Sequence, residues 1–241
     1  SLENEAQVIA LDRTLANLLK DVDKQVGLQH TLIVLSADHG MSEMPEYLQE
    51  LGYPAQRIYN EEVLELANNL GKTLFGIEQV ASSFFRPSLY LDHDALARAD
   101  LDSEEVAIAL AAALSQQVGI GEARATAELL SREHSGVAGQ MQRNTHPARS
   151  GDIYIAQAPY GFMFEKGAVA AMHGSPWNYD THVPLVFVGT GIKPGRVSRT
   201  VHPVDVAPTL SALTGLAAPA AAQGQVLAEV LSGRGALPAG R

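Results

Sequence analysis

An apolar run at Thr31–Ser36 that leads directly into an Asp-His-Gly sequence is the feature that most limits how this chain can fold. The run "TLIVLS" is short and continuous, which is typical of a central strand covered on both faces. An amphipathic helix is predicted before it, from about Asn4 to Gly27, because apolar residues recur there at helical spacing. A helix, a turn and a buried strand in that order favour an α/β fold with a doubly wound sheet.

Further helices and strands are predicted along the rest of the chain. Polar, acidic or proline residues mark the start of each helix, as helix N-termini prefer. The helices are expected at residues 60–70, 103–118 and 202–215, and the strands at 88–92, 152–157 and 183–189. The alternation of the two element types again favours the α/β class.

Three segments differ in character. Residues 1–44 carry the first helix, strand and polar loop, and residues 158–241 carry a second polar loop, a strand and the last helices. The stretch between them, residues 45–157, is richer in the helix formers Ala, Glu and Leu. It is interpreted as an insertion or lid carried by the sheet.

Composition excludes several functions. A formal net charge of -10 argues against a nucleic-acid binder, because phosphate backbones are held by clusters of Lys and Arg. No run approaches the roughly 18 to 20 apolar residues of a membrane-spanning helix, and no signal peptide is visible, although the start at Ser1 leaves a processed or truncated N-terminus open. Without cysteine there is no thiolate nucleophile and no Cys-ligated zinc, so any metal must be held by His and carboxylates.

The Asp38-His39 pair has two interpretations. Asp38 could simply cap the following turn, with His39 an ordinary surface residue. Alternatively, the pair binds a ligand, because ligands of open α/β sheets lie outside the carboxyl ends of the strands. A carboxylate and a neutral imidazole together suit zinc or manganese, and Gly40 would let the backbone turn sharply enough for both to face one point.

A second loop, "MHGSPWNYDTHVPLVF" at Met172–Phe187, places His173 and His182 before another apolar strand. Either histidine could be a hydrogen-bonded structural residue. The His-Gly pair at His173 nevertheless repeats the pattern of the first loop. Two such loops at one sheet edge could meet around a ligand.

Five further residues are weaker candidates. His146, Arg149 and Asp152 precede a predicted strand and could reach a substrate phosphate, or they could form an ordinary solvated loop. Trp177 and Tyr179 could stack on a leaving group, or they could pack the second loop against the protein. The remaining histidines, His30, His93, His134 and His202, are expected to be structural.

Three segments in a fixed order carry a resemblance. "LIVLSADHGM", then "HGSPWNYDTHVPLVFVGTGI", then "VDVAPTLSALTG" resemble the C-terminal part of the alkaline phosphatase superfamily. The branch that they resemble most contains the monomeric alkaline phosphatases and the type I phosphodiesterase/nucleotide pyrophosphatase enzymes. The resemblance implies an α/β fold with a doubly wound sheet of the alkaline phosphatase type, lacking its N-terminal part and carrying a helical or mixed insertion.

The resemblance also implies a metal site. Enzymes of this kind hydrolyse phosphate esters with two zinc ions about 4 Å apart. On this basis Asp38 and His39 would bind one zinc ion and His173 the other. His182 would orient His173 or a substrate oxygen, or would replace His173 as the ligand.

Several parts of the family pattern have no counterpart here: the Thr or Ser nucleophile, an early metal-binding Asp, an Asp-x-x-x-His pair and the groups that hold the phosphate. The opening "SLENEAQVIALDRTLANLL" resembles the helix that directly follows the Asp-x-x-x-His pair. The chain is therefore expected to be a fragment whose partner is the missing N-terminal part of the same protein. Alone it should be inactive, because each metal needs about three or four convergent ligands.

The full-length protein is thus expected to be a metal-dependent phosphatase or phosphodiesterase that acts on a small phosphate ester and is periplasmic or secreted, as the resemblance implies. Whether monoesters or diesters are the substrate stays open. One alternative is a non-catalytic binding or regulatory module with the same fold. Others are a sulfatase, a phosphonate hydrolase or a phosphoglycerate mutase from the same superfamily.

Overall fold

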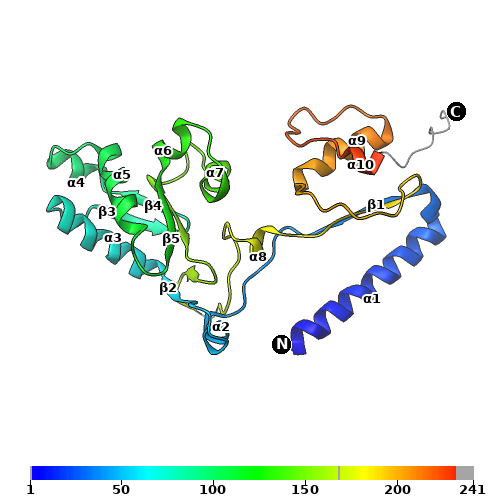
Figure 1. The fold of residues 1–241 in the computed structure, drawn as a ribbon, viewed down its shortest axis with the longest axis horizontal. Coiled ribbons are helices and arrows are strands. Elements are labelled where there is room, and N and C mark those ends of the chain that lie inside the picture. The colour runs from blue at the N-terminus through cyan, green and yellow to red at the C-terminus, as the bar shows by residue number, and fades with distance from the viewer. Residues whose placement is uncertain (1, 168, 232–241) are drawn as a thin grey trace. The chain divides into compact units, whose positions relative to one another are not determined.

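The computed structural model describes residues 2–167 and 169–231, and it divides into two compact units. The first unit is formed by the chain up to Asp38 and from Pro184 onward, and the second by His39–Val183. Helices and strands alternate in both, which confirms the predicted α/β class (Figure 1). No helix within the described residues is long and apolar enough to cross a membrane.

The first unit is built around one pair of strands. Its elements are α1 (Leu2–Gln25), the 3-10 turn η1 (Leu28–His30), β1 (Leu32–Ser36), β8 (Leu185–Gly189), the 3-10 turn η2 (Pro203–Asp205), α9 (Val206–Thr214) and α10 (Ala228–Leu231). The helix α1 ends before Gly27, whose φ of 87° is a conformation that glycine adopts without strain. The last residues of the predicted C-terminal segment, 232–241, lie outside the described residues.

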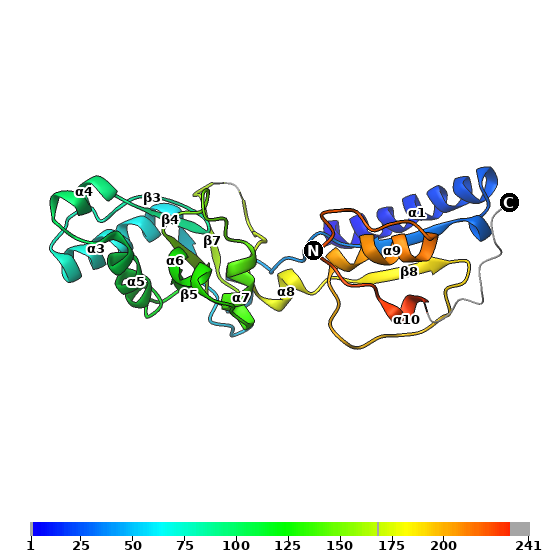
Figure 2. The same cartoon turned by 90° about the horizontal axis from the view of Figure 1, so that it is seen from above.

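Strand β1 pairs antiparallel with β8, in a register that runs from Leu32 opposite Gly189 to Ser36 opposite Leu185 (Figure 2). Both strands lie where the sequence predicts them. The predicted burial of β1 is wrong, because its residues are half-buried or exposed. Within the described residues this sheet has only two strands, so β1 has a paired strand along one edge only.

The second unit contains the whole of the predicted insertion, residues 45–157. Its helices are α2 (Pro45–Glu50), α3 (Asn60–Phe75), α4 (His93–Arg98), α5 (Ser103–Leu114), α6 (Thr126–Ser131), α7 (Gly136–Arg143) and α8 (Asn178–Thr181). Its strands are β2 (Arg57–Tyr59), β3 (Ala81–Phe85), β4 (Ser88–Leu91), β5 (Ile120–Ala125), β6 (Ile153–Gln157) and β7 (Phe162–Phe164). The helices and strands predicted in this part of the chain are confirmed.

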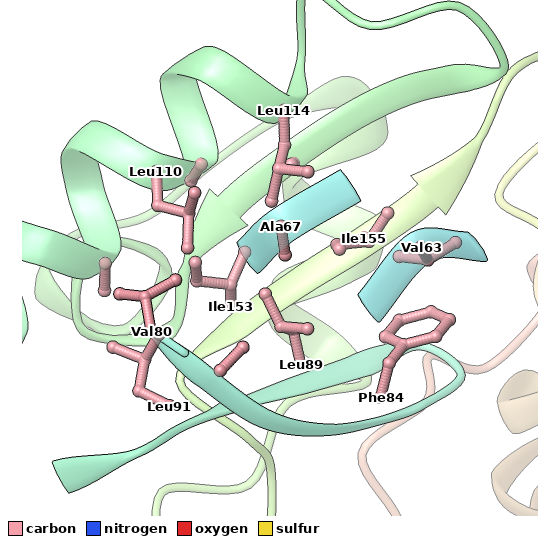
Figure 3. Close-up of a cluster of buried hydrophobic side chains, with 14 of the residues drawn as sticks. Val63, Ala67, Val80, Phe84, Leu89, Leu91, Leu110, Leu114, Ile153 and Ile155 are labelled. Atoms are coloured by element: carbon pink, nitrogen blue, oxygen red, sulfur yellow. The ribbon is translucent and has the colours of Figure 1, made fainter. Parts of the chain in front are cut away.

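Four of these strands form an antiparallel sheet in the order β3-β4-β6-β5, while β2 and β7 pair parallel in a separate ladder. Figure 3 shows how side chains of α5, such as Leu110 and Leu114, meet Leu89 of β4 and Ile153 and Ile155 of β6. All five are almost completely excluded from solvent. This cluster is the core of the second unit.

Strand β6 is buried along its whole length. Its side chains alternate, so that Tyr154 and Ala156 belong to a second cluster with Leu129 of α6 and Met141 of α7. The strand covered on both faces is therefore β6, and the sequence analysis assigned that position to β1. Both strands are short apolar runs, and only the packing of helices on each face distinguishes them.

Candidate metal site

Two of the predicted ligands, His39 and His173, lie against each other. Their rings stack with centroids 3.6 Å apart and planes inclined by 5°. His39 lies in the loop after β1, and His173 lies in the loop between β7 and α8. Both residues are half-buried. The second unit thus brings together two imidazoles that are far apart in the sequence.

The ring of His39 is oriented by its neighbour. Its Nδ1 lies 2.7 Å from the carbonyl oxygen of Gly40. Because a carbonyl oxygen can only accept a hydrogen bond, Nδ1 carries the proton and the lone pair of the neutral ring is on Nε2. Metal-binding histidines are commonly held by such a bond from the opposite ring nitrogen. The residue therefore fits the role of a metal ligand.

The loop of His39 is joined to α8 at very short range. The amide of Gly40 donates to the carbonyl oxygen of Asp180 at 2.8 Å. A β-carbon at Gly40 would lie 2.0 Å from the carbonyl oxygen of Tyr179, so no other residue fits without a shift of backbone. The buried side chain of Asp180 in turn accepts from the amide of Ser175 at 2.7 Å. Helix α8 therefore connects the loops of both histidines.

The loop of His173 has a second support. Arg86, in the turn between β3 and β4, donates from Nη2 to the carbonyl oxygen of His173 at 2.6 Å. Neither Arg86 nor Asp180 was predicted from the sequence. Asp180 falls inside the quoted segment "NYDTHVP", so proximity to two histidines was a signal for it, whereas Arg86 belongs to no motif.

Asp38 and His182 are more exposed than the stacked pair. Asp38 is exposed and ends the N-terminal segment of the first unit. His182 is exposed and follows the end of α8, where its amide donates to the carbonyl oxygen of Asn178 at 2.9 Å. Within residues 2–167 and 169–231, no group of three or more His, Asp or Glu side chains is close enough together to hold a metal ion.

The aromatic residues of the second loop pack against the body of the second unit. Trp177 donates from Nε1 to the carbonyl oxygen of Gln157 at 2.9 Å. Tyr179 stacks on Tyr160, with ring centroids 5.2 Å apart, and its hydroxyl accepts from the Tyr160 amide. Burial, the main cause, raises the pKa of Tyr179. Of the two interpretations of these aromatics, these contacts favour loop packing.

The polar residues before β6 have structural partners. The carboxylate of Asp152 accepts from the amide of Leu91 at 2.8 Å and lies 3.0 Å from Nε2 of His93. The ring of His146 accepts from the amide of Ala148, and the amide of Arg149 donates to the carbonyl oxygen of His146. These bonds stabilise a turn and the end of β4. They favour the structural interpretation over a phosphate-binding one.

Residues 1–181 match the family described as type I phosphodiesterase/nucleotide pyrophosphatase. The chain belongs to this family. The resemblance to the alkaline phosphatase superfamily, drawn from three sequence segments, is thereby confirmed. The matched residues include both stacked histidines, and they end at Thr181, the last residue of α8.

Curated relatives match most of this chain. The chain is 30% identical over 233 residues to alkaline phosphatase PafA of Elizabethkingia meningoseptica. This match covers 96% of this chain and 42% of the relative. It is 27% identical to a protein of Myroides odoratus named calcium-transporting ATPase, over 88% of this chain and 39% of the relative. It is 28% identical to alkaline phosphatase PhoV of Synechococcus elongatus, over 96% of this chain and 41% of the relative. The chain thus spans about two fifths of the length of each.

A solved structure confirms the fold. The crystal structure of wild-type alkaline phosphatase PafA matches with a TM-score of 0.77 at 28% identity, covering 92% of this chain and 42% of that one. The α/β fold is therefore that of the alkaline phosphatases. As with the relatives, the match extends over less than half of the longer protein.

Proposed function

We propose that this chain is the C-terminal part of a phosphoric ester hydrolase that uses two zinc ions and is periplasmic or secreted. The observation that carries the proposal is the stacked pair of His39 and His173 in a member of this family. When bound, zinc ions would supply Lewis-acid stabilisation of charge on the phosphoryl oxygens and clamp the attacking and leaving oxygens.

The geometry of the stack favours two ions over one. The lone pair of an imidazole nitrogen lies in the plane of its ring. Two planes inclined by 5° with centroids 3.6 Å apart direct their lone pairs side by side and not to one point. Such an arrangement suits neighbouring ions about 4 Å apart, one for each ring. We therefore assign His39 to one zinc ion and His173 to the other.

The other two predicted residues receive roles consistent with their chemistry. Asp38 would contribute a carboxylate oxygen to the ion of His39, which it directly precedes in the chain. His182, beyond the end of α8, would orient a substrate oxygen or His173. The stacked ring of His173 makes it the preferred ligand of the two histidines in the second loop.

The remaining parts of the enzyme are proposed to lie in the rest of the protein. The relatives are more than twice as long as this chain, and the nucleophile and further ligands of the family have no counterpart in it. Phosphoryl transfer through a covalent intermediate requires an activated nucleophile. We infer that the isolated chain binds zinc weakly and does not turn over phosphate esters.

The second unit is proposed to act as an insertion or lid, with residues 45–157 as its body. Ser36 and Leu185 face each other in the β1–β8 ladder, so the chain leaves this sheet and returns to it at neighbouring positions. Insertions of whole domains are tolerated where their two ends lie close together. The pairing supports the proposal that this unit was added to a pre-existing sheet.

Steady-state assays of the full-length protein and of the isolated chain, with aryl phosphate mono- and diesters and added zinc, test the proposal. The full-length protein should be active, and His39→Ala or His173→Ala should lower kcat/KM by more than ~100-fold. His134→Ala is the matched control, because its ring bonds to the carbonyl oxygen of Glu128 in the same unit. Robust turnover by the isolated chain, abolished by Asp38→Ala, would show that the fragment is not inactive.

Two further outcomes separate the alternatives. Calorimetric zinc titration of the full-length protein that reveals no dependence on Asp38, His39 or His173, together with no turnover, would favour the binding or regulatory module. Turnover of aryl sulfates or phosphonates in preference to phosphate esters would move the assignment to another activity of the superfamily.

A further inference from the structure

Arg86 connects the body of the second unit to the loop of His173. It lies in the tight turn between β3 and β4, where Phe85 is paired with Ser88. Its guanidinium donates from Nη2 to the carbonyl oxygen of His173 at 2.6 Å, across 87 positions of sequence. A charged donor and a short distance make this one of the stronger hydrogen bonds available to a backbone carbonyl.

The same guanidinium packs against the residue that follows. Gly174 has a φ of +90°, and a β-carbon there would lie 2.9 Å from Nη2 of Arg86. The glycine therefore both adopts the left-handed backbone conformation and leaves the space that the guanidinium fills. The peptide between His173 and Gly174 is held in position by one side chain of the insertion.

The bond is made in a partly dehydrated environment. Burial, the largest effect, lowers the pKa of Arg86, whereas Tyr154, Asp180 and Tyr179 raise it. Among the described residues, Nη1 of Arg86 and Oδ1 of Asp180 have no hydrogen-bond partner, and both atoms are buried. Unsatisfied buried groups of this kind lower stability, and they often coincide with a functional constraint.

We propose that Arg86 is a positioning residue, which fixes the His173–Gly174 backbone so that the ring of His173 lies parallel to the ring of His39. The effect of this positioning on catalysis rests on the proposed function. The ring of His39 is held independently, through Gly40 and Asp180. Without Arg86, only one ring of the pair would keep its orientation. Small displacements of a metal ligand or reacting group have large effects on rate.

The first test needs no metal. In the isolated chain, with labelled histidine and at one fixed alkaline pH, NMR measures the ring-current shifts of His39 and His173. Arg86→Ala should abolish the mutual shielding of the stacked rings. Arg86→Lys, which keeps the positive charge and N–H donors, should restore part of it. Arg124→Ala is the control, because Arg124 bonds to Glu122 and Glu128 in the same unit.

The second test uses the full-length protein. Arg86→Ala should weaken the zinc site of His173 by ~10- to 100-fold in a competition titration, with partial recovery in Arg86→Lys and little change in Arg124→Ala. The zinc site of His39 should keep its affinity. A thermal melt of each variant separates loss of the site from loss of the fold, which a merely structural role would produce.

The outcomes are distinguishable. Wild-type ring shifts in a folded Arg86→Ala variant would overturn the positioning role. If that variant does not fold, Arg86→Met, which keeps an unbranched side chain and removes the donors, decides, and wild-type ring shifts there would overturn the positioning role equally. If the wild-type full-length protein binds no zinc at His39 or His173, the proposed function fails, while the NMR comparison still tests the effect of Arg86 on the stacked pair.

Discussion

The two units of the chain differ sharply in how well they bury their apolar residues. In the second unit, Leu89, Leu110 and Ile153 have no solvent-exposed surface and belong to one continuous cluster. In the first unit, none of the described residues of α1 is buried, and Leu11 and Leu18 are each 55% exposed. Similar apolar content thus gives a closed core in one unit and an open surface in the other.

The second unit therefore has the buried apolar core that a self-sufficient domain requires, whereas the first unit does not. A helix with an apolar face is stabilised mainly by the surface that covers that face. We infer that the missing cover of α1 and of the β1–β8 pair is the rest of the proposed enzyme. Exposed apolar surface of this kind is typical of a protein contact that is not yet made.

The largest expected effect comes from separating the two units. Residues 39–183 expressed alone should unfold cooperatively, because their core is complete. The first unit, with Asp38 joined to Pro184 by a short turn, should bind a hydrophobic dye and lack a sharp transition. Circular dichroism melts check for the cooperative transition in each unit, and dye fluorescence checks for exposed apolar surface. A cooperative transition in the isolated first unit would break the comparison.

A pair of matched substitutions sharpens the comparison of the two units. Leu110→Ala removes a side chain that is fully buried between α5 and the sheet, so it should cost about 2–5 kcal/mol of unfolding free energy. Leu18→Ala, on α1, should change it by less than about 0.5 kcal/mol in this chain. Urea titration of each variant measures the difference. Equal costs would mean that α1 is covered in solution.

A polar substitution probes how the second unit holds the loops of His39 and His173. Asp180→Ala should destabilise this unit by about 1–3 kcal/mol, because the buried amide of Ser175 then loses its acceptor. Thermal denaturation measures the cost, and Asp152→Ala, which removes the acceptor of the Leu91 amide, provides a comparison outside the loops. No loss of stability on removing Asp180 would show that the loop finds another arrangement.

The smallest effect is a pH dependence confined to the second unit. Two hydrogen bonds from Arg57, at 2.7 and 2.8 Å, are the main reason that the pKa of Glu46 falls from 4.5 to about 2. The folded pKa lies below the unfolded one, so the stabilisation is complete above about pH 4.5 and is lost as pH falls toward 2. Because Glu46 is largely exposed, the pair should contribute only ~0.2–1 kcal/mol.

Acid titration of the wild type and Glu46→Gln checks this expectation. The variant should lose the part of the stability change that occurs between about pH 4.5 and 2. Glu78→Gln is the control, because the ion pair of Glu78 with Lys72 joins two largely exposed side chains. Identical acid profiles of wild type and Glu46→Gln would show that the Arg57 pair does not stabilise the fold.

Local pattern was enough to predict most helices and strands, because periodicity and helix-terminal residues depend on near neighbours. Burial was not predictable in the same way. "TLIVLS" and "IYIAQ" are both short apolar runs, and only the helices packed on each side make β6 the covered strand and leave β1 open. That difference depends on residues distant in sequence.

In the candidate site, too, some residues could be predicted from local sequence and others could not. The Asp-His-Gly and His-Gly sequences were sufficient to single out His39 and His173, which the structure brings into contact. Arg86 was missed, because a guanidinium that bonds to a distant carbonyl leaves no trace in local spacing, whereas Asp180 was missed although it lies between His173 and His182 in the second loop. Residues that act through the backbone of others are found only when the tertiary contacts are known.

The close approach at Gly40 also has an evolutionary consequence. A β-carbon there would overlap the carbonyl oxygen of Tyr179, so purifying selection at this position would act on steric fit and not on metal chemistry. A glycine retained beside Asp38 and His39 in diverging descendants would therefore record that α8 still touches this loop. It would persist even in a lineage that had lost the side chains of Asp38 and His39, and would mark ancestry more durably than activity.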